Sequence, residues 1–209
     1  MATRYEDKAH ARYLTFGCYH HYHLFQHSDL CQLFLDHLDR IRKQENIHVW
    51  AYVIMPDHVH LLVYSEQEKP LGSLLSRLKS EFAFKALKWI EEHDPITYEK
   101  LRVEPVGKVK LQKPEGHPVG HPKQQRGFES KGKVSFRFWQ RGGGYDRNIH
   151  SDEAIRKSME YIHNNPVKVG IVNLPEKYQW SSAGYWLVGD HSGFKPDEPF
   201  WWRDSETRP

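Results

Sequence analysis

Apolar positions in the first half of the chain recur with two periods, one of two residues and one of three to four. The first is the period of a strand with one buried face, and the second is that of a helix with an apolar stripe. The turn-forming pair Pro56-Asp57 separates two strand-like runs and predicts a tight hairpin. The elements expected here are strands at 13–20, 47–55 and 58–64, and helices from Ser28 to about Lys43 and from Gly72 to about Leu87.

The pattern fails over residues 94–132, where prolines and glycines alternate among basic residues. Such a stretch is typical of a long loop or an insertion. Beyond it, residues 134–140 predict another strand. Ser151 then opens a helix that we expect to run to about Asn164 and to stop before Pro166.

The resulting order is strand, helix, strand, strand, helix, insertion, strand, helix. An antiparallel sheet with helices packed on one face, of ferredoxin-like type, is the simplest α+β architecture that this order allows. We therefore expect one domain over 1–209, interrupted by a basic Pro/Gly-rich insertion at about 95–132. The aromatic C-terminal tail at about 174–209 is expected to be irregular.

The composition of the chain limits the cellular compartments that we expect for the protein. The N-terminal residues are charged and polar, without the apolar core of a secretion signal, and no apolar run is long enough to span a bilayer. Cys18 and Cys31 lack the spacing of a metal or redox motif and suit a reducing compartment. These features predict a cytoplasmic protein that does not contact membranes.

The net charge of +3 conceals an uneven distribution of charge along the chain. Residues 100–147 carry twelve Lys and Arg against four Asp and Glu, so the rest of the chain is acidic. A basic segment in an otherwise acidic protein is typical of a surface that binds polyanions. A solvated basic loop without a ligand explains the same charges equally well, so charge alone leaves the partner open.

His58 and His60 begin the strand that follows the tight turn. Because side chains alternate along a strand, both imidazoles point to one face and Val59 points to the other. Two imidazoles side by side form half of a divalent-metal site. A pair of surface histidines, in a chain that has fifteen of them, is the competing interpretation.

Tyr161 and Asn165 lie four residues apart on the last predicted helix and therefore share a face. If that face packs over the strand with His58 and His60, Asn165 can add an amide oxygen to the metal and Tyr161 can place its hydroxyl beside it. Two nitrogens and one oxygen with open positions suit Mg²⁺ or Mn²⁺ better than a structural zinc ion. A helical tyrosine more commonly packs in a core, so only the joint geometry separates the two interpretations.

Four blocks of sequence together resemble the HUH-type single-strand tyrosine transposases, and among these the REP-associated tyrosine transposases. The similarity covers most of residues 13–186. The chain departs from the family pattern in its basic insertion and in the longer glycine run at 142–144. The four blocks are MPDHVHLLV around His58 and His60, YIHNNPVKVGIV from Tyr161, FWQRGGGYDRNI from Phe138 and YQWSSAGYW from Tyr178.

The resemblance implies an HUH endonuclease fold and a phosphodiester transesterification that nicks and rejoins DNA. His58, His60 and Asn165 would hold Mg²⁺ or Mn²⁺. Tyr161 would attack the scissile phosphorus and leave a 5′-phosphotyrosine linkage and a free 3′-hydroxyl. The substrate would be single-stranded DNA near a repeat hairpin, and the location would be the nucleoid of a prokaryotic cell.

Substrate contacts are expected from basic side chains, which bind phosphates, and from exposed aromatic side chains, which stack on unpaired bases. Trp139 and Tyr145 are candidates for stacking, although either also suits the core. The sequence leaves open whether the site is built within one chain or shared across a homodimer. The candidates for DNA contact are Arg77, Lys79, Lys85, Arg141 and Arg147.

Two other functions use some of the same residues. A catalytically silent protein that binds single-stranded or hairpin nucleic acid would need Tyr161 only for packing. A metal hydrolase would use water as its nucleophile and would need a general base, for which the sequence offers Asp57 in the turn and Glu160. Formation of a covalent protein–DNA adduct separates the transposase from both.

Overall fold

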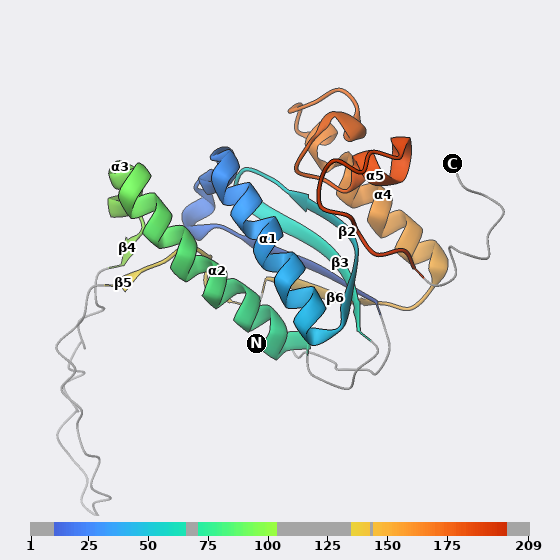
Figure 1. Ribbon diagram of the computed structural model, residues 1–209, viewed down its shortest axis with the longest axis horizontal. Helices are drawn as coiled ribbons and strands as arrows, with labels where there is room; N and C mark the ends of the chain where they lie inside the picture. The colour runs from blue at the N-terminus through green and yellow to red at the C-terminus, as the bar shows by residue number, and fades with distance from the viewer. Residues whose placement is uncertain (1–10, 66–70, 104–134, 143, 200–209) are drawn as a thin grey trace, which may run out of the picture.

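The computed structural model describes residues 11–65, 71–103, 135–142 and 144–199, arranged as in Figure 1. Its main sheet has the strand order β2-β3-β1-β6, with each neighbouring pair antiparallel. The sheet and its long helices are β1 (Ala11–Gly17), α1 (Ser28–Glu45), β2 (Ile47–Ile54), β3 (His58–Ser65), α2 (Leu71–His93), β6 (Tyr145–Ile149) and α4 (Asp152–Lys168). The shorter elements are η1 (Tyr19–His21), η2 (Leu24–Gln26), α3 (Pro95–Lys100), β4 (Arg102–Val103), β5 (Ser135–Phe136), η3 (Pro175–Lys177) and α5 (Ala183–Val188).

The order and pairing of these elements are those of a ferredoxin-like fold. The chain runs β1-α1-β2-β3-α2-β6, which is a strand–helix–strand unit followed by a second one. The first strand of each unit, β1 or β3, lies in the middle of the sheet. The predicted α+β class and ferredoxin-like sheet are therefore confirmed, and they place the His58–His60 strand beside β1.

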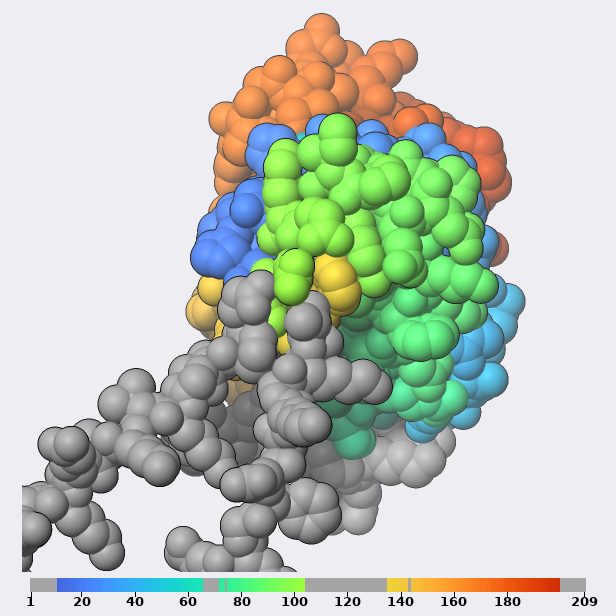
Figure 2. Space-filling view, turned by 90° about the vertical axis from the view of Figure 1, so that its left-hand side faces the viewer, coloured from blue at the N-terminus to red at the C-terminus, as the bar shows by residue number. Residues whose placement is uncertain are grey.

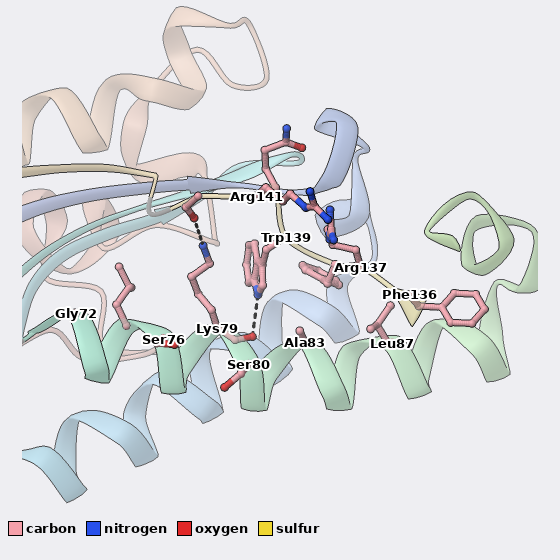
Figure 3. Close-up of a pocket in the computed structure, with 14 residues that line it drawn as sticks. Gly72, Ser76, Lys79, Ser80, Ala83, Leu87, Phe136, Arg137, Trp139 and Arg141 are labelled. Carbon is pink, nitrogen blue, oxygen red and sulfur yellow. Dashed lines mark hydrogen bonds between the residues drawn. The ribbon is translucent and has the colours of Figure 1, made fainter. Parts of the chain in front are cut away.

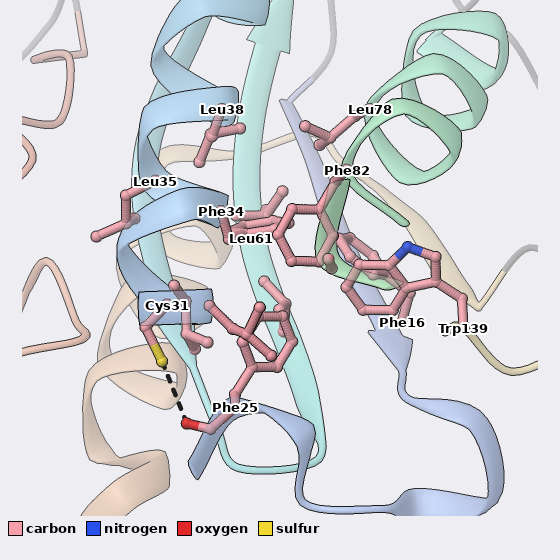
Figure 4. Close-up of a cluster of buried hydrophobic side chains, with 14 of the residues drawn as sticks. Phe16, Phe25, Cys31, Phe34, Leu35, Leu38, Leu61, Leu78, Phe82 and Trp139 are labelled. Carbon is pink, nitrogen blue, oxygen red and sulfur yellow. Dashed lines mark hydrogen bonds between the residues drawn. The ribbon is translucent and has the colours of Figure 1, made fainter. Parts of the chain in front are cut away.

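One face of the sheet is covered by α1 and α2 through a core of aromatic side chains (Figure 4). The ring centroids of Phe34 of α1 and Phe82 of α2 lie 5.1 Å apart, and those of Phe16 of β1 and Trp139 lie 4.9 Å apart. All four side chains are buried. Aromatic pairs at such separations add to the free energy gained by burying apolar area. This core holds β1 against the two helices and fixes the segment around Trp139.

The opposite face of the sheet is covered in part by α4. Ile155, Met159 and Ile162 of this helix are buried in a second cluster with Trp50 and Leu62 of the sheet. The expectation of helices on one face therefore holds for α1 and α2 but leaves out α4, which lies across the sheet from them (Figure 1). The physical reason is that β2 is apolar on both faces, so each of its faces needs cover.

The fourth strand of the sheet is not the predicted one. Residues 134–140 were the expected strand, but within them only β5 is a strand, and it pairs with β4 outside the main sheet. The observed fourth strand, β6, has the polar sequence YDRNI and was missed. An edge strand with one exposed face needs few apolar residues, so it lacks the pattern by which strands are recognised.

Two prolines were given the wrong role. Pro95 was placed in the patternless stretch, yet it starts α3, with the Asp94 carboxylate accepting a hydrogen bond from the Thr97 backbone N–H. Proline suits the first turn of a helix because its missing N–H has no helical partner there.

Pro166 was expected to lie beyond the last helix, but α4 continues to Lys168 and the Val169 N–H bonds to the Asn165 carbonyl. The predicted cap is confirmed, since the Ser151 hydroxyl accepts from the Ala154 N–H.

The remaining expectations concern the insertion and the tail. The start of the expected insertion forms α3 and β4, and its residues 104–132 lie outside the described part of the chain. The tail was expected to be irregular but contains η3 and α5, and this segment packs against β2, at the end of the molecule remote from α3 (Figures 1 and 2). Among the described helices, none is long and apolar enough to cross a membrane.

Candidate active site

His58 and His60 lie side by side on the sheet face that α4 covers. In the register with β1, His58 stands opposite Gly17 and His60 opposite Thr15. Val59 between them is buried in the core beneath α1 and α2, as strand alternation predicts. The Nε2 atoms of the two imidazoles lie 2.9 Å apart. The two nitrogens therefore converge on one point, which is the geometry needed to share a cation.

The other ring nitrogen of each imidazole is held by a polar side chain. Nδ1 of His58 lies 2.5 Å from a carboxylate oxygen of Asp57. Nδ1 of His60 lies 2.7 Å from the Thr15 hydroxyl and 2.8 Å from the Tyr13 hydroxyl. A histidine ligand binds a metal through one nitrogen when the proton on the other is held by such a partner. This arrangement leaves both Nε2 atoms for a shared ion.

The protonation states of these groups suit a metal site. Burial, reinforced by the nearby His58, lowers the pKa of His60 to about 3, so this imidazole is neutral at physiological pH. Burial alone would raise the pKa of Asp57, but hydrogen bonds from His58 and His21 outweigh it and lower that pKa. Burial raises the pKa of Tyr13 to about 12. A neutral imidazole such as that of His60, backed by hydroxyls, is the form that binds divalent metals.

Tyr161 of α4 reaches the same place from the other side. Its ring centroid lies 6.0 Å from that of His60 and 6.2 Å from that of Tyr13. The side chain is 46% exposed, so Tyr161 is not packed in the core. Nζ of Lys168, two turns further along α4, lies 3.9 Å from the centroid of the Tyr161 ring. The Tyr161 ring therefore lies near the His60 ring within one chain.

An open pocket of about 560 Å³ lies in front of these groups, and we call it the tyrosine pocket. It is formed by β1, β3, β6 and the first half of α4. The residues of the pocket that matter for the chemistry are Tyr13, Thr15, His60, Tyr145, Arg147 and Tyr161.

Asn165 lies one helical turn beyond Tyr161, on the same face of α4. Its side chain is 7% exposed, and its amide Nδ2 has no hydrogen-bond partner among the described residues. A buried amide donor without a partner is uncommon, and only the amide oxygen, not this nitrogen, could bind a cation. The described residues contain no cluster of three or more His, Cys, Asp or Glu that could hold a metal. A third protein ligand beside the two histidines would therefore be of another type, and the Asn165 amide oxygen is of such a type, on the helix that carries Tyr161.

The five candidates for DNA contact do not form one surface. Arg147 is exposed on β6 and lines the tyrosine pocket. Lys79 and Arg141 line a separate groove beside α2. Lys85 is exposed on α2 outside both hollows. Arg77 forms ion pairs with Glu45 and Glu81, so it is less available to a phosphate than the sequence suggested.

The two aromatic candidates for base stacking, Trp139 and Tyr145, differ in how far they are exposed. Trp139 is 6% exposed and donates its indole N–H to the Lys79 carbonyl, so it is a core residue. Tyr145 is 53% exposed, and its ring centroid lies 5.8 Å from that of Tyr13 in the tyrosine pocket. Of the two, only Tyr145 offers a face on which a base could stack.

Sequence reasoning missed three residues of the site: Tyr13, Thr15 and Lys168. Tyr13 and Thr15 alternate along β1 with the core residues Leu14 and Phe16, so their shared face could be predicted. Their contact with His60 depends on β1 pairing with β3, which the ferredoxin-like strand order supplies. Lys168 was missed because the helix was expected to end before Pro166.

Replacing Thr15 by Val should weaken metal binding without unfolding the protein. Valine keeps the shape of the side chain but removes the hydroxyl that lies 2.7 Å from His60 Nδ1. Loss of such a supporting contact typically weakens metal affinity by about 10-fold or more. Titration with Mn²⁺ followed by calorimetry measures the change. Ser158→Ala is the matched control, because Ser158 lines the same pocket but bonds to the Ala154 carbonyl. Equal Mn²⁺ affinities for both variants would show that Thr15 does not position His60.

Comparison with known proteins finds one matching family model and several solved structures of similar fold. A family model described as "Transposase IS200 like" matches residues 10–102, which include His58 and His60 but not Tyr161. A solved structure of a REP-associated tyrosine transposase bound to a REP hairpin is similar over 96% of this chain and 98% of its own, with a TM-score of 0.59 and 15% identity. A crystal structure of a transposase candidate from Deinococcus radiodurans R1 is similar over 78% of this chain and 96% of its own, with a TM-score of 0.41 and 14% identity.

No curated protein sequence matches the chain. The resemblance to single-strand tyrosine transposases, inferred from the four sequence blocks, is confirmed by the transposase family model, and the fold is shared with the REP-associated enzyme.

Proposed function

We propose that this chain, an IS200-like transposase by its family match, is a metal-dependent enzyme that nicks and rejoins single-stranded DNA next to repeat hairpins. The observation that carries the proposal is the position of Tyr161, whose exposed phenol stands with its ring centroid 6.0 Å from that of His60 in an open pocket. A nucleophile, a cation site and room for a substrate are thereby together.

The chemistry proposed for this site is a transesterification. The Tyr161 oxygen forms a bond to the scissile phosphorus as the bond from phosphorus to the 3′-oxygen breaks. The phenol loses its proton, the departing 3′-oxygen gains one, and a 5′-phosphotyrosine linkage remains. The linkage retains the energy of the phosphodiester, so a 3′-hydroxyl can later attack it and rejoin the strand without ATP.

His58, His60 and Asn165 are the residues that would hold the metal. When bound, Mg²⁺ or Mn²⁺ would supply charge stabilisation to the phosphate oxygens of the reacting group. Two imidazole nitrogens favour Mn²⁺ over Mg²⁺, because magnesium prefers oxygen ligands and keeps its water. The role of Tyr13, Thr15 and Asp57 is to orient the two rings through their Nδ1 atoms.

DNA is the proposed partner, and a repeat hairpin is its proposed form. The support is the family match and the fold shared with a transposase that is bound to a REP hairpin in its structure. Tyr145 and Arg147 in the tyrosine pocket offer an aromatic face and a cation for an unpaired nucleotide. Nucleoid association in a prokaryotic cell follows from this partner as part of the proposal. The residues proposed for catalysis come from one chain, so the proposal needs no second copy.

The two competing functions are less well supported by the geometry. In a silent binding protein Tyr161 would only pack, but it is 46% exposed. In a water-activating hydrolase Asp57 would be a general base, but its carboxylate is held by His58 and His21. The experiment that separates the three is formation of a protein–DNA adduct with Mn²⁺ on a hairpin oligonucleotide with single-stranded flanks, resolved on a denaturing gel. An adduct on Tyr161 supports the transposase, and its absence contradicts it.

Lys168 should speed adduct formation, because its ammonium lies over the ring of Tyr161, the proposed nucleophile. A cation there steadies the ring and offsets charge that develops on the phosphate. Lys168→Met should therefore slow single-turnover adduct formation by about 10-fold or more, and Lys168→Arg should restore most of the rate. Lys157→Met is the control, since Lys157 lies on the same helix and lines the tyrosine pocket but pairs with Glu153. A rate for the Lys168→Met variant within twofold of wild type would contradict this role.

A further inference from the structure

A third histidine, His21, contacts the hairpin turn that leads into the strand with the imidazole pair. β1 ends at Gly17, which stands opposite His58 in the register with β3. The N–H of the next residue, Cys18, bonds to the Asp57 carbonyl, so the chain stays close to the hairpin turn as it leaves the sheet. It then forms a turn over residues 18–22 that includes η1, and we call this segment the histidine turn.

His21 and His58 share the two oxygens of one carboxylate. Nδ1 of His21 lies 3.1 Å from Oδ2 of Asp57, and Nδ1 of His58 lies 2.5 Å from Oδ1. Because an ionised carboxylate only accepts hydrogen bonds, each imidazole donates an N–H to it. The carboxylate is therefore held from two sides. Its position sets the orientation of the His58 ring, whose Nε2 faces that of His60.

His21 reaches the carboxylate through an unfavourable backbone conformation. His20 and His21 have φ angles of +51° and +55°, in the left-handed region that residues other than glycine rarely adopt. Among the described non-glycine residues, only Asn46, at the end of α1, shares this conformation. The His21 side chain is 75% exposed, so burial does not explain the strain. Strain of this kind is concentrated at functional sites, where the surrounding structure maintains it.

The histidine turn is held in place by the segment that follows β5. The Tyr19 N–H bonds to the Phe138 carbonyl, and the next N–H along the chain donates to the side chain of Gln140. The Arg137 guanidinium lies 5.6 Å from the centroid of the Tyr19 ring, and Figure 3 shows Arg137 beside this part of the chain. None of these contacts involves the hairpin turn. The imidazole that binds the carboxylate is therefore carried by an independently fixed backbone.

We propose that His21 is a positioning residue for the metal site, which holds the Asp57 carboxylate and through it orients His58 toward the shared ion. The inference rests on the proposed function, in which His58 is a metal ligand. The Nδ1 atom of His60 is held by two hydroxyls of β1, within the sheet. That of His58 depends on one carboxylate in a turn. A ligand is oriented best when its supporting group is itself hydrogen-bonded, and His21 supplies that second bond.

The test replaces His21 by Gly in the full chain and measures the affinity for Mn²⁺ by calorimetry. Glycine removes the imidazole and also relieves the left-handed strain. The affinity should therefore fall by about fivefold, the typical worth of one hydrogen bond, while the midpoint of thermal unfolding should be no lower than that of wild type. His21→Asn should restore the affinity to within about twofold of wild type, because its amide donates from nearly the same place and asparagine tolerates this backbone.

His20→Gly is the matched control. It relieves the same strain one residue earlier and leaves the contact between His21 and Asp57 in place, so the affinity for Mn²⁺ should stay within about twofold of wild type. A second measurement uses the metal-free chain in EDTA and follows the Nδ1–H proton of His58 by NMR. In His21→Gly this proton should exchange with water about fivefold faster than in wild type, because the carboxylate that binds it is less firmly held.

Three results would each overturn the proposal. The first is a His21→Gly variant that keeps wild-type Mn²⁺ affinity or wild-type exchange at His58. The second is a His20→Gly variant that loses as much affinity. The third is a lower unfolding midpoint in His21→Gly, or a failure of His21→Asn to restore binding, since a residue that serves only the fold would behave in this way. A wild-type chain that binds no Mn²⁺ contradicts the proposed function as well, whereas a wild type that binds Mn²⁺ no better than His21→Gly contradicts this proposal alone.

Discussion

Tyr161→Phe should abolish the covalent protein–DNA adduct altogether, which is the largest single effect expected for this protein. The substitution removes one oxygen and keeps the ring that lies 6.0 Å from His60 and under Lys168. Metal and DNA binding should therefore persist while the bond to phosphorus cannot form. Loss of a nucleophile commonly costs on the order of 10³-fold or more in rate. The measurement is a denaturing gel after incubation with Mn²⁺ and a labelled hairpin oligonucleotide.

Two further phenols, Tyr13 and Tyr145, lie in the same pocket and could receive the DNA instead. Peptide mapping of the wild-type adduct by mass spectrometry distinguishes the three. Tyr185→Phe is the matched control, because the Tyr185 hydroxyl bonds to Glu198 outside the pocket and should not affect the adduct. Cleavage that survives in Tyr161→Phe without any adduct would mean that water is the nucleophile. Absence of an adduct in the wild type would favour a binding protein.

The shared face of His58 and His60 could be predicted from sequence because it depends on strand alternation, which is local. The same holds for Tyr161 and Asn165, which share a face through helical spacing. The fold class could be predicted as well, since the order of apolar patterns allows few arrangements. The sequence did not show that the histidine pair and the face of α4 with Tyr161 lie together. That was a hypothesis about packing, namely that the last helix crosses the strand with the histidines.

The features that could not be predicted depend on contacts between distant parts of the chain. β6 is polar, and it is a strand because β1 offers it a pairing edge, with Gly144 making the close approach possible. Arg77 and Lys79 look alike in sequence, but Arg77 forms ion pairs with Glu45 and Glu81, whereas Lys79 lies beside the Gly142 carbonyl. Charge patterns identified the basic helix without showing which of its cations remain available to DNA.

Replacing both His58 and His60 by Ala should remove specific binding of Mn²⁺ and, with it, adduct formation. The two Nε2 atoms are 2.9 Å apart, so they act on one ion, and Asn165 alone cannot hold a divalent cation. We expect the affinity for Mn²⁺ to fall by about 100-fold or more, measured by calorimetry on the full chain. Because fifteen histidines give weak background binding, His48→Ala/His93→Ala is the matched control.

The same double variant tests whether the histidines serve the fold rather than a metal. His60 is 5% exposed and contacts the hydroxyls of Tyr13 and Thr15. Leaving these hydroxyls without a partner should lower the free energy of unfolding by about 1–3 kcal/mol, which a domain of this size tolerates. Thermal unfolding should therefore remain cooperative at a reduced midpoint. A double variant that unfolds outright would identify the pair as core residues, and one that folds and still binds Mn²⁺ would place the metal elsewhere, leaving Tyr161 without the cation that its proposed chemistry requires.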